Sequence, residues 1–349
     1  MKIFKSFAFY FVQLLFCGIL LEVAAHFFLL GSKNPLYRAR RVLQVDSTLG
    51  WKQKPNLNTQ FENSALTTNA EGFRSSETAA DAELLTLGPS SAFGWGISSE
   101  QTYTAIAGSN THLKFFNGGQ IGYSALQGRK LWNDVLKSRF PNLKVAVISY
   151  GINDLDKFRF YSDEPTSIEK IEKYSDFFTM LSLAFSEISY KYKCEDLVTI
   201  KQRLSLPDYL FEIAALVQDL RANGVIPVIV NTPYFLKQDR VQDPQTIAVE
   251  YAKVEQSARA NDCQAAMEHL KIAKGLEPER VQRDVIVLNT ALREFASANK
   301  LAYIDAYTAL DSSKKEQNFV DPVHPSAVGH QLIARQLSDS VLQLLHGKK

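Results

Sequence analysis

Five short apolar runs, separated by longer stretches with helical spacing, constrain the fold of this chain most. The runs are largely apolar at successive positions rather than alternating, and they cover 83–87, 113–116, 144–149, 225–230 and 301–305. Continuous apolar character indicates strands buried on both faces, and long helical connections indicate parallel pairing. The pattern therefore predicts an α/β fold with a five-stranded parallel sheet. Helices are expected at 124–138, 207–223, 284–299 and 325–345, the last with Pro325 in its first turn.

Two stretches interrupt this alternation and are read as insertions. The first, residues 155–205, is mixed polar and aromatic. The second covers about 238–283, and its residues 245–280 are plainly helical. Within the second stretch, residues 261–266 with Ala273 and Pro278 resemble one helix pair of the tetratricopeptide kind. A single pair cannot form a stable solenoid, so we expect a local helical hairpin packed on the domain rather than a repeat array.

The N-terminus holds the longest apolar stretch. From Phe7 to Leu30 the only strongly polar residues are Gln13, Glu22 and His26. These 24 residues, at about 1.5 Å each, would cross a hydrocarbon core of roughly 30 Å. Residues 1–31 are therefore predicted to be a transmembrane anchor in contact with membrane lipid. A cleaved signal peptide is the alternative, but its apolar core is usually only ~7–15 residues long.

The polar and charged residues in and around this stretch leave open the partners of Glu22 and His26 and the orientation of the helix in the membrane. Glu22 and His26 lie four residues apart and share a helix face, where they can pair with each other or with a membrane protein partner. They can also simply reach the membrane interface. The positive-inside rule does not decide the orientation, because basic residues stand on both sides of the stretch: Lys2, Lys5, Lys33, Arg38, Arg40 and Arg41.

Residues 32–82 are basic and then polar, with few apolar positions at helical spacing. We predict a juxtamembrane strap that packs on the main domain through Trp51 and Phe73, because the stretch lacks the composition of a free linker. The net charge of +2, with 22% charged residues, gives no reason to expect nucleic acid as a partner.

Three cysteines do not make a disulfide framework, although Cys194 and Cys263 can bridge in an oxidising compartment. Cys17 is expected to be lipid-facing or packed. No cluster with metal-ligand spacing is present in the sequence, and no cofactor or metal is expected.

Ser90 is the candidate nucleophile. It follows the first predicted strand through Gly88 into a glycine-punctuated turn, where an α/β sheet presents a side chain at its carboxyl edge. A serine hydroxyl is a weak nucleophile unless a base takes its proton and donors receive the oxyanion. Ser90 as a cap of the next helix is the alternative role. Ser91 is the alternative nucleophile.

Asp321 and His324 are the most specific pair in the sequence. An imidazole acts as a general base only if its tautomer is fixed, and a carboxylate three residues earlier on a tight loop can reach its other nitrogen. The other histidines lack such a neighbour: His112 and His269 are expected at the surface, His330 in the last helix and His346 in the tail.

Two loops can supply oxyanion donors. Gly122 lies in a glycine-rich loop after the second strand, where a backbone N–H can point into the crevice. Phosphate binding is the rival interpretation, but the dinucleotide spacing and a Gly-Lys-Ser/Thr ending are both missing. Asn153 follows the third strand and can donate its side-chain amide, or it can be a turn residue.

Ser90, Gly122, Asn153 and the Asp321–His324 pair occur in an order that resembles the SGNH (GDSL-like) hydrolase superfamily, over roughly residues 83–349. The residues before this region also resemble membrane-anchored bacterial members, through the anchor, Gly50-Trp51 and Gly72-Phe73-Arg74. One departure is Pro89, which stands where the family motif Gly-Asp-Ser has its acid.

The resemblance implies a three-layer α/β/α flavodoxin-like fold and acyl-ester chemistry. It implies that Ser90 is the nucleophile, that His324 is the base and that Asp321 orients His324. The oxyanion hole would consist of the Ser90 and Gly122 N–H groups and the Asn153 side chain.

The sequence therefore predicts an anchor at 1–31, a strap at 32–82 and an SGNH-like domain at 83–349. The expected protein is a serine esterase or O-acyltransferase of the inner membrane, acting extracytoplasmically on an acylated envelope glycan or lipid. One alternative is a catalytically silent subunit of a membrane complex, which Pro89, the Glu22/His26 face and the helical hairpin motivate. The other is a lectin-like glycan binder that uses the same crevice.

Overall fold

The computed structural model describes residues 2–32, 35–62, 64–155, 160–161, 166–172, 174–192, 203–235, 244–275, 277–310 and 315–347. The chain forms two compact units. The first consists of Met1–Lys52 and Arg159–Lys193, and the second of Gln53–Phe158 and Cys194–Lys349. The domain boundaries predicted from the sequence stay a prediction.

The second unit is built on a parallel sheet of five strands. These are β5 (Leu84–Leu87), β6 (Phe115–Asn117), β7 (Val145–Ile148), β8 (Ile226–Val230) and β9 (Ala302–Ile304). Their order across the sheet is β6-β5-β7-β8-β9, and every neighbouring pair is parallel. This flavodoxin-like order confirms the predicted α/β class and has its topological switch point between β5 and β7.

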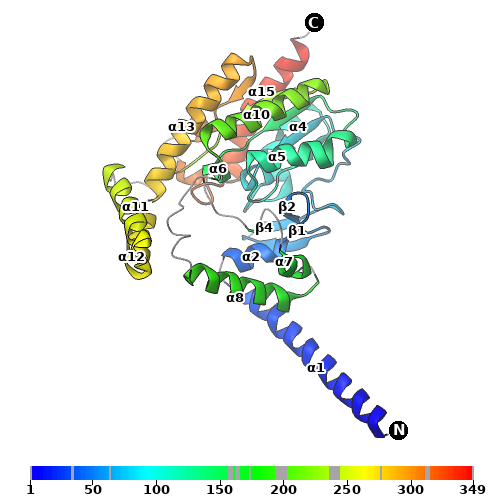
Figure 1. Ribbon diagram of the computed structural model, residues 1–349. Helices are drawn as coiled ribbons and strands as arrows, with labels where there is room; N and C mark the ends of the chain where they lie inside the picture. The colour runs from blue at the N-terminus through cyan, green and yellow to red at the C-terminus, as the bar shows by residue number, and fades with distance from the viewer. Residues whose placement is uncertain are drawn as a thin grey trace. The chain divides into compact units, whose positions relative to one another are not determined.

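Helices cover both faces of this sheet (Figure 1). Helices α4 (Tyr103–Thr111) and α15 (Ala327–His346) pack together on one face, and α5 (Ala125–Leu131), α10 (Leu206–Ala222) and α13 (Glu277–Ala298) cover the other. All residues of β5 and β7 are buried, which explains their continuous apolar character. The core under α15 includes Leu84, Val145, Val228, Ile333 and Leu337.

Three helix boundaries differ from the prediction. Pro325 lies before α15 rather than in its first turn, because Ser326 is the N-cap and accepts the Gly329 N–H at 3.2 Å. The helix expected at 124–138 is α5 followed by a π-turn, Trp132–Leu136, and a 3₁₀ turn, Lys137–Arg139. Helix α13 begins at Glu277 rather than at 284.

The expected strap is more regular than predicted. Strands β3 (Asn58–Phe61) and β4 (Ser64–Thr67) pair as an antiparallel hairpin in the second unit. Phe73 is buried and contacts Phe116 on β6, with ring centroids 5.1 Å apart. Trp51 belongs to the first unit, where its indole contacts Phe160 with ring centroids 6.2 Å apart, and its predicted contact with the main domain stays a prediction.

The first unit contains α1 (Lys2–Gly31), α2 (Pro35–Val42), β1 (Leu43–Asp46), β2 (Gly50–Gln53), α7 (Ser167–Glu172) and α8 (Asp176–Tyr192). Within α1, Phe9–Gly31 is long and apolar enough to cross a membrane, and a signal sequence meets the same criterion. Cys17 is exposed on this helix, whereas Cys194 lies outside the described residues.

Glu22 and His26 of α1 have hydrogen-bond partners within the chain. Glu22 accepts the Ser175 hydroxyl at 2.7 Å and the Asp176 N–H, and His26 Nδ1 lies 2.6 Å from the Asp176 carboxylate. The sequence offered pairing with each other or with another subunit. The structure instead pairs both residues with the start of α8.

The second insertion forms a helical hairpin of α11 (Pro244–Arg259) and α12 (Cys263–Gly275). The two helices share a small apolar interior of Val254, Ala258, Ala266 and Leu270.

Candidate active site

The candidate residues come together at the carboxyl edge of the sheet. Strands β6, β5 and β7 are neighbours, and the loops after them carry Gly122, Ser90 and Asn153. Backbone hydrogen bonds of 2.9 Å join these loops: the Gln120 N–H donates to the Gly88 carbonyl, and the Ser149 N–H donates to the Leu87 carbonyl. This edge is where flavodoxin-like sheets bind ligands.

Pro89 fits the turn that presents Ser90. It is the N-cap of the short helix α3 (Ser90–Phe93), and its φ of −83° is close to the value that the pyrrolidine ring imposes. Its carbonyl accepts the N–H groups of Ala92 and Phe93 at 3.0 and 2.9 Å. A proline lacks only the N–H, which an N-cap does not contribute to the helix, so Pro89 leaves this turn intact.

Ser90, His324 and Asp321 form a continuous hydrogen-bonded chain. The Ser90 hydroxyl lies 2.7 Å from His324 Nε2, and His324 Nδ1 lies 2.8 and 2.7 Å from the two Asp321 oxygens. Because Nδ1 faces only carboxylate oxygens, it carries the ring hydrogen, and Nε2 is left to accept the serine proton. These are the residues that the sequence predicts as nucleophile, base and orienting acid, and their catalytic roles stay a prediction.

The Asp321 carboxylate stays ionised in this position. Burial acts to raise its pKa, but the hydrogen bond from the His324 ring, the His324 charge and the N–H groups of Val323 and His324 outweigh burial and lower the pKa. Both N–H groups donate to Asp321 Oδ1 at 3.0 Å. An ionised Asp321 can therefore hold the His324 tautomer and stabilise an imidazolium.

Aromatic rings support His324 from one side. The Trp95 indole stacks on the imidazole with centroids 5.0 Å apart and planes inclined by 12°. Phe61, from the β3–β4 hairpin, meets Trp95 edge to face at 4.8 Å. The hairpin thus reaches the candidate base through one intervening ring, a connection that the sequence did not reveal.

The loop that carries Asp321 and His324 is fixed at both ends. The Val320 N–H donates to the His324 carbonyl at 2.8 Å, and Phe319 forms an isolated bridge with Pro325. From the loop after β8, the Phe235 N–H donates to the Pro322 carbonyl at 2.7 Å. These bonds hold the orientation of the pair relative to Ser90.

The expected oxyanion donors lie in the loops after β5, β6 and β7. Gly122 has a φ of +79°, which favours glycine. Among the hydrogen bonds of the described residues, none uses the Ser90 or Gly122 N–H as a donor. Asn153, in the short helix α6 (Ile152–Leu155), donates one Nδ2 hydrogen to the Tyr123 carbonyl at 3.1 Å and retains a second.

Asp154 is a buried residue of the site region to which sequence reasoning gave no role. Its Oδ1 accepts the Ala125 N–H at 2.9 Å, so it links the Asn153 loop to the start of α5 just after Gly122. Burial raises its pKa to about 7, despite the Ala125 N–H and the charge of Arg203. Its position directly after Asn153 was the available signal.

Arg74 is a second such residue. It is buried and donates from Nη2 to the Ala65 carbonyl at 3.0 Å and from Nε to the Ser99 hydroxyl at 3.0 Å. It also donates to the carbonyls of Gly94 and Ile97, and thereby fixes the loop that follows α3 and carries Trp95. Burial lowers the pKa of the guanidinium to about 10.

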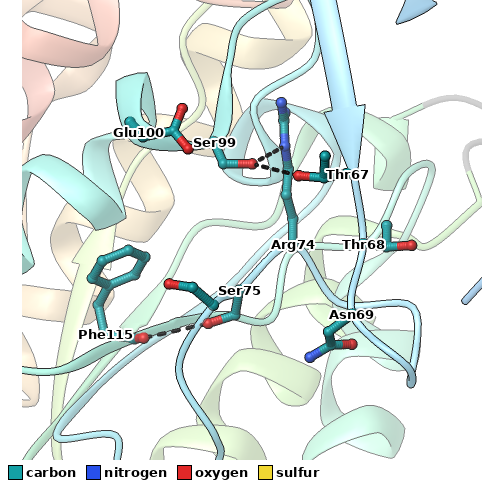
Figure 2. Close-up of a pocket in the computed structure, with 9 residues that line it drawn as sticks. Thr67, Thr68, Asn69, Arg74, Ser75, Ser99, Glu100 and Phe115 are labelled. Carbon is teal, nitrogen blue, oxygen red and sulfur yellow. Dashed lines mark hydrogen bonds between the residues drawn. The ribbon is translucent and has the colours of Figure 1, made fainter. Parts of the chain in front are cut away.

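Figure 2 shows Arg74 with Ser99 and Thr67 beside a cavity of about 230 Å³. Its lining is rich in hydroxyl groups, but these groups bond largely to one another and to the backbone: Thr67 pairs with Ser99, and Ser75 donates to the Phe115 carbonyl. The residues that line the cavity therefore serve to hold the loop that carries Trp95.

Two other histidines, His330 and His269, have partners outside the Ser90–His324–Asp321 chain. His330 is buried, accepts the Tyr103 N–H at 3.0 Å, and has its pKa lowered to about 3 by burial, so it is neutral. His269, expected at the surface, lies 3.0 Å from the Glu250 carboxylate. No group of His, Cys, Asp and Glu in the described part of the chain could hold a metal ion.

A three-layer α/β/α fold that brings a serine, a histidine and an aspartate together at the carboxyl edge of its sheet defines a protein of the hydrolase class. The model of the GDSL-like lipase/acylhydrolase family matches residues 86–332. The chain belongs to this family, as the sequence motifs indicated.

Several solved structures are similar to the chain. A member of the lipolytic protein G-D-S-L family from Veillonella parvula is 12% identical, with 75% of this chain and 98% of that chain covered and a TM-score of 0.44. The lipase/acylhydrolase from Enterococcus faecalis is 14% identical, with 74% and 95% covered and a TM-score of 0.42. A catalytic mutant of an acetylxylan esterase from Geobacillus stearothermophilus is 15% identical, with 75% and 94% covered and a TM-score of 0.43. No curated protein matches the chain.

Proposed function

We propose that the chain is a membrane-anchored serine esterase or O-acyltransferase that works through an acyl-serine intermediate. The observation that carries this proposal is the hydrogen-bonded chain from Ser90 through His324 to Asp321. The substrate class we infer is an ester-bearing or hydroxyl-bearing glycan or lipid of the cell envelope, with the catalytic unit on the extracytoplasmic side of the inner membrane.

In the proposed first step, Ser90 Oγ attacks the acyl carbon while His324 Nε2 takes the hydroxyl proton. The oxyanion that forms would be met by the Ser90 and Gly122 N–H groups and the free Nδ2 hydrogen of Asn153. The leaving alcohol then takes the proton from His324, and the acyl group remains on Ser90.

In the second step, a hydroxyl-bearing acceptor attacks the acyl-serine, and His324 again takes and returns the proton. Water as the acceptor gives an esterase, and a glycan or lipid hydroxyl gives an O-acyltransferase. Asp321 holds the imidazole throughout and stabilises its charged form.

A fluorophosphonate probe tests the proposal on the full-length chain in detergent. We expect wild type to be labelled on one serine and Ser90→Ala to be unlabelled. The matched control is Ser91→Ala, which should keep labelling because Ser91 has no role in the proposed chain. A folded wild type that resists labelling, or labelling that follows Ser91, would contradict the proposal.

Two further measurements test the reaction type and the membrane orientation separately. Release of free acid from an acetylated sugar, compared with transfer of the acetyl group to an added sugar, distinguishes esterase from O-acyltransferase. A reporter fused to the C-terminus shows which side of the membrane holds the catalytic unit. A cytoplasmic reporter would exclude an extracytoplasmic substrate.

Two of the three features that motivated the catalytically silent alternative are also compatible with an active enzyme. Pro89 is compatible with the turn that presents Ser90, and Glu22 and His26 are bonded to residues of α8. Esterase turnover by an isolated monomer would rule this alternative out.

A further inference from the structure

Helix α7 in the first unit has its polar and apolar faces reversed. Its two carboxylates, Glu169 and Glu172, are only 7% and 5% exposed, whereas its two isoleucines, Ile168 and Ile171, are 43% and 42% exposed. A helix at a water-facing surface turns its apolar side chains inward and its charges outward. The reversal indicates that the outer face of α7 does not meet water.

The interior of the first unit provides partners for the inward carboxylates. Arg40 donates from Nη1 to Glu172 at 2.9 Å, and its guanidinium lies 3.3 Å above the Tyr161 ring. Glu169 accepts the Thr166 N–H at 2.7 Å. Burying a carboxylate is costly unless it is paired, so this network is a built feature that keeps the charges away from the outer face.

Exposed aromatic side chains follow α7, one in the turn before α8 and one in the first turn of α8. Tyr174 is 77% exposed and Phe178 is 39% exposed, and they follow Ile171 at intervals of three and four residues. We call these four residues, Ile168, Ile171, Tyr174 and Phe178, the α7–α8 stripe. Large exposed apolar side chains gathered in this way mark an interaction surface.

The stripe is continuous with the apolar helix α1. Ser175 and Asp176, which lie between Tyr174 and Phe178, are the residues that bond to Glu22 and His26. Figure 1 shows α8 running across the C-terminal part of α1. Tyr174 and Phe178 therefore flank the residues that bond to the two ionisable side chains of α1.

The positions of the charged residues on α1 indicate where the contact between α1 and α8 would lie relative to a bilayer. No charged residue lies between Lys5 and Glu22, a separation of roughly 26 Å at 1.5 Å per residue and close to the thickness of a hydrocarbon core. All residues from 9 to 21 are exposed, and burial on α1 begins with Ala25 and Leu29. Glu22 and the start of α8 thus lie at the C-terminal end of the uncharged, fully exposed part of the Phe9–Gly31 segment.

We propose that the α7–α8 stripe is a second membrane contact, inserted into the lipid interface beside α1. This inference rests on the membrane anchoring in the proposed function but not on its chemistry. Interfacial helices insert their apolar face at the boundary between headgroups and acyl chains, and the exposed Lys170 on α7 can reach lipid phosphates. The first unit is then held flat on the membrane rather than swinging on a single helix.

The test uses the full-length chain reconstituted into vesicles of phosphatidylethanolamine and phosphatidylglycerol. The photoreactive residue p-benzoylphenylalanine replaces Tyr174 or Phe178, and after irradiation lipid adducts are measured by mass. The matched control places it at Phe211 on α10, an aromatic side chain that is 66% exposed in the second unit. We expect lipid adducts at 174 and 178, and none above background at 211.

Each other outcome overturns the inference. Crosslinks from 174 and 178 to protein would show that the stripe docks on a subunit or on the second unit, and no crosslinks at all would place it in water. The same samples are labelled with fluorophosphonate. Lipid adducts without serine labelling would refute the proposed chemistry alone, whereas an intact mass that lacks α1 would refute the anchoring on which both proposals rest.

Discussion

Asp154 offers the sharpest quantitative prediction from the structure. Burial raises its pKa from 3.8 to about 7 in the folded chain. Between these two values the unfolded state has lost the proton and the folded state keeps it, so the free energy of unfolding falls as pH rises. A shift of roughly 3 units corresponds to about 4 kcal/mol, all of it lost above pH ~7.

The perturbation is Asp154→Asn. The amide oxygen can still accept the Ala125 N–H, and the side chain has no charge to bury. Relative to wild type, the variant should gain stability with pH, from near zero around pH ~4 to on the order of 4 kcal/mol above pH ~8. Denaturant unfolding of the full chain in detergent, followed by tryptophan fluorescence at several pH values, measures the difference.

The control is Asp134→Asn, which changes an exposed carboxylate on the π-turn after α5. It is carried through the same series to report the effect of removing a surface carboxylate. If the Asp154→Asn curve runs parallel to wild type over this range, the carboxyl is ionised at neutral pH and the reasoning from burial is wrong.

Three other substitutions probe the supports of the site. Trp95→Leu removes the ring stacked on His324. Such a contact stabilises a cationic ring by ~0.5–1 kcal/mol, so we expect fluorophosphonate labelling to slow about 3-fold, and Trp95→Phe should lie closer to wild type. Gly88→Ala would place a Cβ 2.6 Å from the Ala92 Cβ and 3.1 Å from a backbone oxygen, so thermal unfolding should show a loss of ~1–3 kcal/mol and labelling should weaken. Arg74→Lys keeps the charge but cannot bond to the five backbone and hydroxyl partners at once, so tryptophan fluorescence should shift and labelling should slow. An unchanged variant would show that Arg74 is dispensable.

The sheet and its site could be predicted because their causes are local. Strands such as β7 are buried on both faces, and this leaves an apolar run that is visible in the sequence. Asp321 and His324 are three residues apart, so one loop brings them together. Ser90 could be placed because a strand-end position in a parallel sheet implies the carboxyl edge.

Other features depend on contacts between distant residues and left no periodic signal. The reversed face of α7 requires Arg40, 132 positions away from Glu172, and a six-residue helix is too short to show a pattern by itself. In the sequence, Arg74 looks like an ordinary residue of the strap. Its importance is visible only in the structure, where it bonds to the carbonyls of Ala65, Gly94 and Ile97.

These distant contacts also explain what residues 53–82 contribute to the site. Phe61 presses on Trp95, which stacks on His324, and Arg74 holds the loop from which Trp95 projects. The histidine ring is therefore fixed on one side by Asp321 and on the other by the segment before the sheet begins. Because an imidazole catalyses only in one orientation, a chain shortened to start at residue 83 would retain Ser90, His324 and Asp321 but lose one of the two constraints on the base.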